Sequence, residues 1–142
     1  MIREFTLGDE KEISALEIEC FSSPWSENAV LESYNLNTKF FVFEEKGKIL
    51  GYAGLQVVLS EGYVTNIAVT KPARGKGIGK ALVDALIGYS EAQNLSFISL
   101  EVRESNIPAI SLYKKCGFKD MGKRKNFYQN PREDANILTK EF

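Results

Sequence analysis

Apolar and polar positions alternate with two different periods along the chain, and the changes of period predict where helices and strands lie. Apolar side chains recur at helical spacing in segments that carry capping or stop residues, which predicts helices over 10–21, 27–34, 80–91 and 107–116. Runs rich in β-branched and aromatic residues predict strands over 39–45, 48–59, 63–69, 97–102, 118–128 and 135–140. We expect Asp9 and Asn106 to cap the first and last helices and Gly117 to end the last one.

The order of these elements predicts a single mixed α/β domain over residues 1–142, with a largely antiparallel sheet and one parallel crossover. Lys46-Gly47 and Glu61-Gly62 are turn sequences that join the long N-terminal strands as antiparallel neighbours. The crossover follows from the order strand, glycine-rich loop, helix, strand between 63 and 102. Alternate residues of 97–102 face opposite sides of the sheet, which places Glu101 opposite the apolar core face.

Composition then removes several classes of function. The 142 residues are 44% hydrophobic, which is enough for one core without disulfides or a structural metal. The 18 basic and 19 acidic side chains nearly cancel, so nothing favours direct binding to nucleic acid or to an anionic membrane. Histidine is absent, which excludes a histidine base or triad. Cys20 and Cys116 form no Cys-x-x-Cys pair, and we interpret both as structural thiols.

The N-terminal segment does not have the pattern of a targeting sequence. Residues 1–12 contain several acids in place of a basic start and an apolar stretch, and no later apolar run has the length of a membrane span. We therefore expect a soluble cytoplasmic protein.

The glycine-rich segment 74–80 is the motif that points most directly to a ligand. Its glycines occupy alternate positions just before a predicted helix, at Gly75, Gly77 and Gly79. Four basic side chains surround them, and no acid lies within 70–83: Lys71, Arg74, Lys76 and Lys80. Backbone N–H groups there can converge on an anion. Leu82 and Ala81 break the dinucleotide and P-loop patterns, so we interpret the segment as a polyphosphate-binding loop; a flexible turn with solvated lysines is the alternative.

This loop resembles the signature of a known superfamily. Arg74-Gly75-Lys76-Gly77-Ile78-Gly79 is similar to the Arg/Gln-x-x-Gly-x-Gly/Ala motif of the GNAT acetyltransferases, and Asn66-Ile67-Ala68-Val69 is similar to their strand beside pantetheine. Other segments resemble the ribosomal-protein-alanine N-acetyltransferases of that superfamily: 21–26, 100–106, 112–118, 124–128 and 133–135. The resemblance implies a GNAT-like sheet in which two splayed parallel strands hold acetyl-coenzyme A.

The resemblance also implies roles for individual residues, with Glu101 as general base and Tyr113 as general acid. The cysteine spacing and the absence of histidine suggest no metal site, and the resemblance implies contacts to acetyl-coenzyme A from Ile67, Ala68, Val69, Arg74, Gly75, Lys76, Gly77, Ile78, Gly79, Lys80 and Asn106. Asn106 and Tyr113 are seven residues apart and so lie within about 20° of the same face of a helix. We expect both to meet Glu101 where the strands splay.

The chemistry of the acceptor favours a protein N-terminus. An α-amine with a pKa of about 7.8 is roughly 10 to 20% neutral at pH 7, whereas lysine at about 10.4 is neutral to less than about 0.1%. The resemblance implies the N-terminal alanine of a small-subunit ribosomal protein as substrate. We expect direct attack by the amine, because Cys116, the only nearby thiol, is a poor candidate for an acyl-enzyme nucleophile.

Other interpretations of the same residues remain open. The fold could serve a lysine side chain or a small amine, or be a non-catalytic coenzyme A-binding or ribosome-binding module. Glu101 beside Arg103 could form a surface ion pair, and Tyr113 could simply pack one face of its helix. We interpret 124–128 as a strand on the substrate side and 129–132 as a loop at the peptide entrance.

Overall fold

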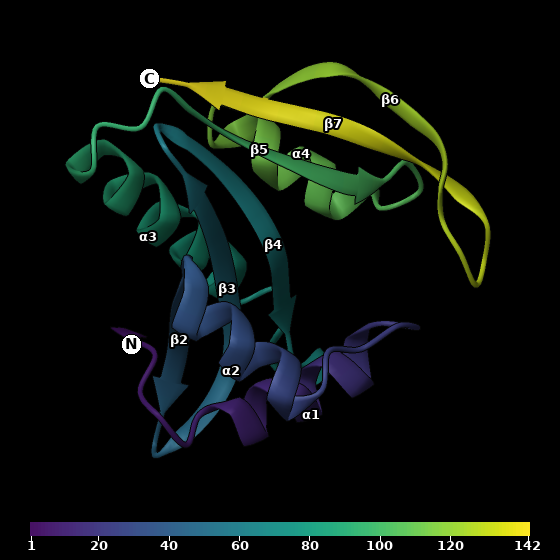
Figure 1. Cartoon of the computed structure of the whole chain (residues 1–142). Coiled ribbons are helices and arrows are strands. Elements are labelled where there is room, and N and C mark those ends of the chain that lie inside the picture. Colours follow the sequence, from purple (N-terminus) through teal and green to yellow (C-terminus); the bar gives the residue numbers. More distant parts are fainter.

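Seven strands form one sheet in the order β1-β2-β3-β4-β5-β7-β6 (Figure 1). A computed structural model describes the whole chain, residues 1–142. The strands are β1 (Ile2–Glu4), β2 (Thr38–Glu45), β3 (Lys48–Val58), β4 (Glu61–Val69), β5 (Phe97–Arg103), β6 (Lys119–Tyr128) and β7 (Glu133–Glu141). The helices are α1 (Glu10–Cys20), α2 (Glu27–Leu36), α3 (Ile78–Ala92) and α4 (Ile107–Lys115), with a short 3₁₀ turn at Lys71–Ala73. The predicted mixed α/β class is confirmed.

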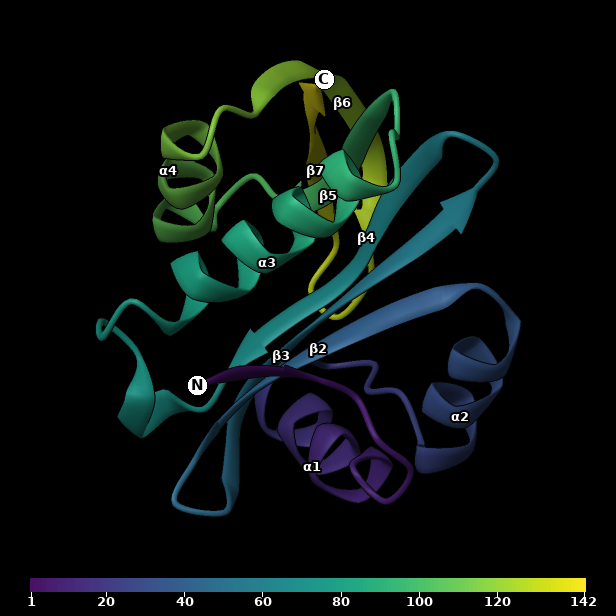
Figure 2. The same ribbon diagram turned by 90° about the vertical axis from the view of Figure 1, so that its left-hand side faces the viewer.

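Helices cover both faces of the sheet, α1 and α2 on one and α3 and α4 on the other (Figure 2). Ile13 and Tyr52 belong to the buried cluster under α1 and α2. Leu82, Leu86 and Ile98 belong to the larger cluster under α3 and α4. Each such side chain contributes about 1.5–3 kcal/mol when it is fully removed from water. The site described below therefore stands on a sheet that is packed from both sides.

The two middle strands of the sheet separate along most of their length. β4 and β5 are the only parallel neighbours, and they pair only over Glu61–Tyr63 and Phe97–Ser99. Beyond these pairs β4 continues to Val69 and β5 to Arg103 without a partner on the facing edge, and the ribbons diverge (Figure 1). The predicted parallel crossover is confirmed, and it opens the sheet in the middle.

A β-bulge bends β4 where this divergence begins. Residues 65–66 of β4 together face the single residue Gly54 of β3. Glycine is required at this position, because an added Cβ would overlap the Thr65 hydroxyl and lie 2.7 Å from the Phe40 ring. A bulge increases the local twist and changes the direction of neighbouring side chains. It therefore turns the end of β4 away from β5.

The N-terminal ends of helices α1 and α3 differ from the prediction. Asp9 does not cap α1, because its own backbone is helical and its carboxylate accepts hydrogen bonds from the Arg3 guanidinium at 2.8 and 3.0 Å. A charged partner from β1 thus replaces the cap. Helix α3 begins at Ile78, two residues before the predicted start, since Gly77 at φ +82° already ends the loop.

The remaining boundaries lie within two residues of the predictions. Asn106 caps α4 as expected, with its Oδ1 accepting from the Ala109 N–H at 3.3 Å. Gly117 follows that helix at φ +98°, a conformation that favours glycine. Strand β1 was not predicted, because three residues are too few to show an alternation. None of the four helices combines the length and the apolar character needed to span a membrane.

Candidate active site

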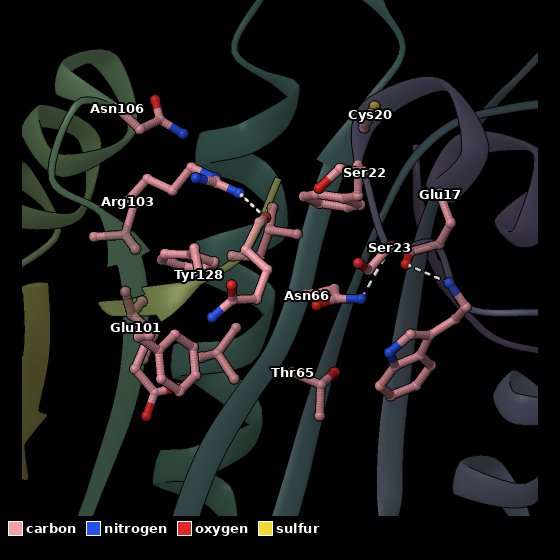
Figure 3. A pocket seen from close by; sticks show the side chains of 18 of the residues that line it. Glu17, Cys20, Ser22, Ser23, Thr65, Asn66, Glu101, Arg103, Asn106 and Tyr128 are labelled. Carbon is pink, nitrogen blue, oxygen red and sulfur yellow. Dashed lines mark hydrogen bonds between the residues drawn. The ribbon is translucent and has the colours of Figure 1, made fainter. Parts of the chain in front are cut away.

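An open cavity of about 820 Å³ lies where β4 and β5 diverge. Residues 64–67 of β4 line one side and residues 100–103 of β5 the other, while 21–25 and 129–131 come from the α1–α2 and β6–β7 connections. Figure 3 shows Glu17, Thr65 and Asn66 on the β4 side, across the cavity from Glu101, Arg103 and Tyr128. The bulge and the short parallel pairing together create this space.

Glu101 lies on the β5 wall with its side chain 34% exposed. Its neighbours Leu100 and Val102 are buried, as the alternation of the strand predicted. The Glu101 Oε1 lies 3.2 Å from the Arg124 Nε of β6. An ion pair does form, but its partner is Arg124 and not Arg103. The Arg124 side chain is 58% exposed, so water screens the pair and Glu101 stays accessible from the cavity.

Tyr113 reaches the same cavity from α4, as the helical spacing with Asn106 predicted. The residue is buried, and its ring packs against Phe118 with centroids 5.8 Å apart. Burial raises the pKa of the Tyr113 hydroxyl to about 12, because the charged phenolate would lose its hydration there. The hydroxyl therefore keeps its proton at neutral pH. The structure brings Glu101, Asn106 and Tyr113 into the lining of one cavity.

Arg103 fixes the β6–β7 connection at the mouth of the cavity. Its guanidinium donates to the carbonyl oxygens of Pro131 at 2.9 Å and Gln129 at 3.1 Å and pairs with Glu133 at 3.1 Å. It also stacks over the Tyr128 ring, 4.5 Å from the centroid. A planar guanidinium can make all these contacts at once. Sequence reasoning did not assign this function to Arg103, since the carbonyl partners are invisible in a sequence.

The glycine loop lies beyond the cavity, between the end of β4 and the start of α3. Gly75 and Gly77 have φ of +80° and +82°, and nothing lies within 4 Å of where a Cβ would stand. The N–H groups of residues 75–80 donate to no protein group. Free amides at a helix N-terminus, with open space before them, fit an anionic pyrophosphate. A side chain at either glycine would strain the backbone and narrow that space.

The charges around this loop differ from the expected uncompensated cluster. Glu19 of α1 accepts from the Lys71 N–H at 2.7 Å, and Lys80 pairs with Asp84 at 2.7 Å. The Arg74 guanidinium turns back and donates to the Val69 carbonyl at 3.0 Å. Both acids lie outside the segment 70–83 in the sequence, so the local count of charges missed them.

The three residues expected to hold the cofactor on β4 are only partly gathered at the cavity. Ile67, Ala68 and Val69 pair with β3 along one edge, and their other edge faces the opening between the strands. Ile67 lines the cavity, whereas Ala68 is buried towards α1. The predicted residues therefore form two groups, one around the cavity and one at the far end of β4.

Glu17 is a buried carboxylate in the cavity lining that sequence reasoning did not single out. It accepts hydrogen bonds from the Tyr52 hydroxyl at 2.5 Å, the Asn66 side-chain amide at 3.0 Å and the backbone N–H of Trp25 at 3.0 Å. Burial raises its pKa, although these hydrogen bonds act in the opposite direction. The signal in the sequence is its position: Glu17 falls on the apolar stripe of α1, four residues after Ile13.

The sequence of this chain is similar to that of a known enzyme family. Residues 11–118 match the Acetyltransferase (GNAT) family, so the chain belongs to that family and is an acyltransferase. Among its relatives, the Escherichia coli K12 ribosomal protein bS18-alanine N-acetyltransferase is 36% identical over 125 residues, which cover 87% of this chain and 84% of that protein. The Haemophilus influenzae protein of the same name is 35% identical over 145 residues, which cover 97% and 96%.

The fold is also similar to that of a relative whose structure is solved. The crystal structure of the ribosomal-protein-S18-alanine N-acetyltransferase from Escherichia coli is similar with a TM-score of 0.92 and 33% identity, over 99% of this chain and 92% of that one. The predicted superfamily, the resemblance to this group of relatives and the predicted fold class are therefore confirmed.

Proposed function

We propose that this enzyme transfers the acetyl group of acetyl-coenzyme A to a protein N-terminal α-amine, namely the N-terminal alanine of a small-subunit ribosomal protein. The observation that carries the proposal is the cavity at the β4–β5 opening, which Glu101 and Tyr113 line together. The names of relatives about one-third identical over most of the chain support this substrate. A ribosomal substrate also implies that the enzyme acts in the cytoplasm.

Acetyl-coenzyme A supplies an activated acetyl thioester, and the residues present fit it. The free N–H groups of 75–80 would bind its pyrophosphate, and the edge of 67–69 that pairs with no strand would bind the extended arm that ends in the thioester. Asn106, whose Oδ1 caps α4, keeps its amide nitrogen for a contact from the opposite wall. The proposed set is Ile67, Ala68, Val69, Arg74, Gly75, Lys76, Gly77, Ile78, Gly79, Lys80 and Asn106.

The protein groups around the cavity supply the proton transfers. Glu101 accepts the proton that the ammonium form of the substrate must lose, either directly or through a water molecule. Tyr113 donates its hydroxyl proton to the departing thiolate, and its raised pKa of about 12 keeps that proton available at neutral pH. Backbone N–H groups on the free edge of 67–69 stabilise the negative charge on the acetyl oxygen during attack.

The shape of the cavity supports an extended peptide as acceptor. The connections 21–25 and 129–131 line the cavity in addition to the two strands. A volume of about 820 Å³ is in the range that holds a ligand of a few residues. An α-amine also needs less help from the base than a lysine side chain, because a larger fraction of it is neutral at pH 7.

A pair of peptides tests this proposal. Thiol release from acetyl-coenzyme A is measured with an alanine-initiated ribosomal-protein peptide and with the same peptide N-acetylated but containing lysine. We expect turnover with the free N-terminus alone. Turnover with only the blocked peptide would make this a lysine acetyltransferase, and no turnover with either would leave a small amine or a binding-only function.

A further inference from the structure

The Glu17 carboxylate joins three separate parts of the molecule. Helix α1 carries it, β3 contributes Tyr52, the bulge of β4 contributes Asn66, and the α1–α2 connection contributes the Trp25 N–H. Figure 3 shows Glu17 and Asn66 facing each other on one side of the cavity. Glu17 is fully buried, and no basic side chain pairs with it. Burial of an ionisable group without a counter-charge is costly, so a purely structural core would be better served by an apolar residue.

The hydrogen-bonding pattern requires a carboxylate at this position. Three donor groups converge on Glu17, and its two oxygens accept all of them. An amide in its place would have one acceptor oxygen and would turn an NH₂ group towards other donors. Of the three partners, only the Tyr52 hydroxyl can reverse its direction without a change of side-chain position.

The α1–α2 connection depends on α1 for its position. The Trp25 N–H binds Glu17, and the Trp25 carbonyl accepts from the Ser14 hydroxyl at 3.1 Å. The indole meets the Phe40 ring edge-on, with centroids 6.5 Å apart. The preceding residues of this connection, Phe21 to Ser23, are exposed and line the cavity. Two side chains of α1 therefore hold the backbone at the end of this wall.

We propose that Glu17 is a positioning residue that couples the α1–α2 connection to the β4 bulge and thereby sets the entrance for the acceptor peptide. The coupling places the wall 21–25 at a fixed distance from the edge of β4 against which the acceptor amine must lie. The effect on acceptor binding rests on the proposed function, whereas the coupling itself does not. Glu17 makes no hydrogen bond to the loop 74–80 or to residues 67–69, so we expect its replacement to change the binding of acetyl-coenzyme A little.

The chain carries its own reporter, because Trp25 is its only tryptophan. Fluorescence of the free protein therefore reports the α1–α2 connection without any substrate. We expect Glu17→Gln to shift the Trp25 emission to longer wavelength and to increase its quenching by acrylamide. Glu32→Gln makes the same chemical change on the exposed surface of α2 and should leave both signals unchanged. An unchanged Trp25 signal in Glu17→Gln would overturn the coupling.

Steady-state kinetics then test the consequence for the acceptor. Loss of buried hydrogen bonds leads us to expect a KM for the peptide raised about tenfold or more in Glu17→Gln, with the KM for acetyl-coenzyme A within about twofold of wild type. A merely structural role would raise both KM values together, and that result would also overturn the proposal. If wild type acetylates no peptide, the proposed function fails while the fluorescence still decides the coupling.

A second pair of variants keeps the test valid if Glu17→Gln folds poorly. Asn66→Asp alone places two carboxylates against each other and should loosen Trp25. Combined with Glu17→Gln, the new carboxylate at position 66 can accept from the amide at position 17, so we expect the double variant to recover most of the Trp25 signal and of the peptide KM. Strictly additive losses in the double variant would contradict the proposed contact.

Discussion

The two walls of the cavity use their carboxylates in opposite ways. On the β4 side, Glu17 is fully buried and all its contacts are with protein donors. On the β5 side, Glu101 is about one-third exposed and has a single ion pair with a solvated arginine, and Tyr113, which lines the same cavity, keeps its proton. The first wall is fixed by internal contacts, whereas the second keeps its groups available. The β4 side is therefore suited to fixing the shape of the cavity, and the β5 side presents groups that can react.

Removal of the proposed proton donor, Tyr113, should have the largest effect. We expect Tyr113→Phe to lower kcat about tenfold to a thousandfold with little change in acetyl-coenzyme A affinity. The pKa of about 12 also predicts no loss of activity from ionisation of Tyr113 below roughly pH 11, because the hydroxyl is protonated below its pKa. Tyr128→Phe is the matched control, since burial raises the pKa of Tyr128 to about 12 as well. A larger loss in that variant would transfer the donor role to Tyr128.

A substitution next to the β4 bulge, on the first wall, should lower the stability of the protein. Gly54→Ala introduces a Cβ that overlaps Thr65 and Phe40, and we expect it to lower the free energy of unfolding by about 1–3 kcal/mol. Gly88→Ala is the control, because a Cβ meets nothing within 4 Å there and alanine favours the helix by about 1 kcal/mol. Urea titration measures both. Equal stability of the two variants would show that the bulge is not tightly packed against β3.

Replacement of the proposed base, Glu101, should change the pH dependence of the rate. We expect Glu101→Gln to flatten the acidic limb of kcat/KM and to lower the rate on the order of tenfold at pH 7, where roughly 10 to 20% of an α-amine is already neutral. Glu104→Gln removes a carboxylate whose ion pair with Lys123 is exposed and should leave the profile unchanged. An unaltered acidic limb in Glu101→Gln would assign the base to another group.

The smallest effect is expected from a substitution of Arg103, which holds the β6–β7 connection at the cavity. Arg103→Lys keeps the charge but loses the planar fork that binds Gln129 and Pro131, so we expect the peptide KM to rise about threefold to tenfold with kcat nearly unchanged. Lys123→Ala, which breaks only an exposed ion pair, serves as control. A fall in kcat equal to the rise in KM would mean that Arg103 contributes to the reaction and not only to the entrance.

The two walls also differ in how far the sequence predicted them. Glu101, Asn106 and Tyr113 follow from strand alternation, helical spacing and the resemblance to a family, and the structure gathers them at one cavity. On the β4 side, the sequence predicted a strand whose residues 67–69 contact the cofactor, but neither the bulge nor the role of Glu17. The bulge depends on the fit of Thr65 against Gly54, and the contacts of Glu17 join positions up to 49 residues apart. No local pattern contains such information.

The charges of the glycine loop show the same limit. The sequence predicted a purely positive loop because the segment 70–83 contains no acid. Glu19, however, contacts the loop from a helix about fifty residues earlier in the chain. The fold class was predictable because it depends on the order and periodicity of elements, which a sequence displays directly. Partners that come from distant elements became visible only in three dimensions.

The short pairing between β4 and β5 has a consequence for self-association. Unpaired strand edges are the usual templates for aggregation, and proteins protect them. Here two such edges lie inside the sheet, where helices on both faces and the connections 21–25 and 129–131 restrict what can approach. The outer edge at β6 has a different protection, since Lys119, Lys123 and Lys125 place repeated positive charge along an exposed strand. The enzyme can thus keep open hydrogen-bonding edges at its centre while its rim discourages another sheet from adding to it.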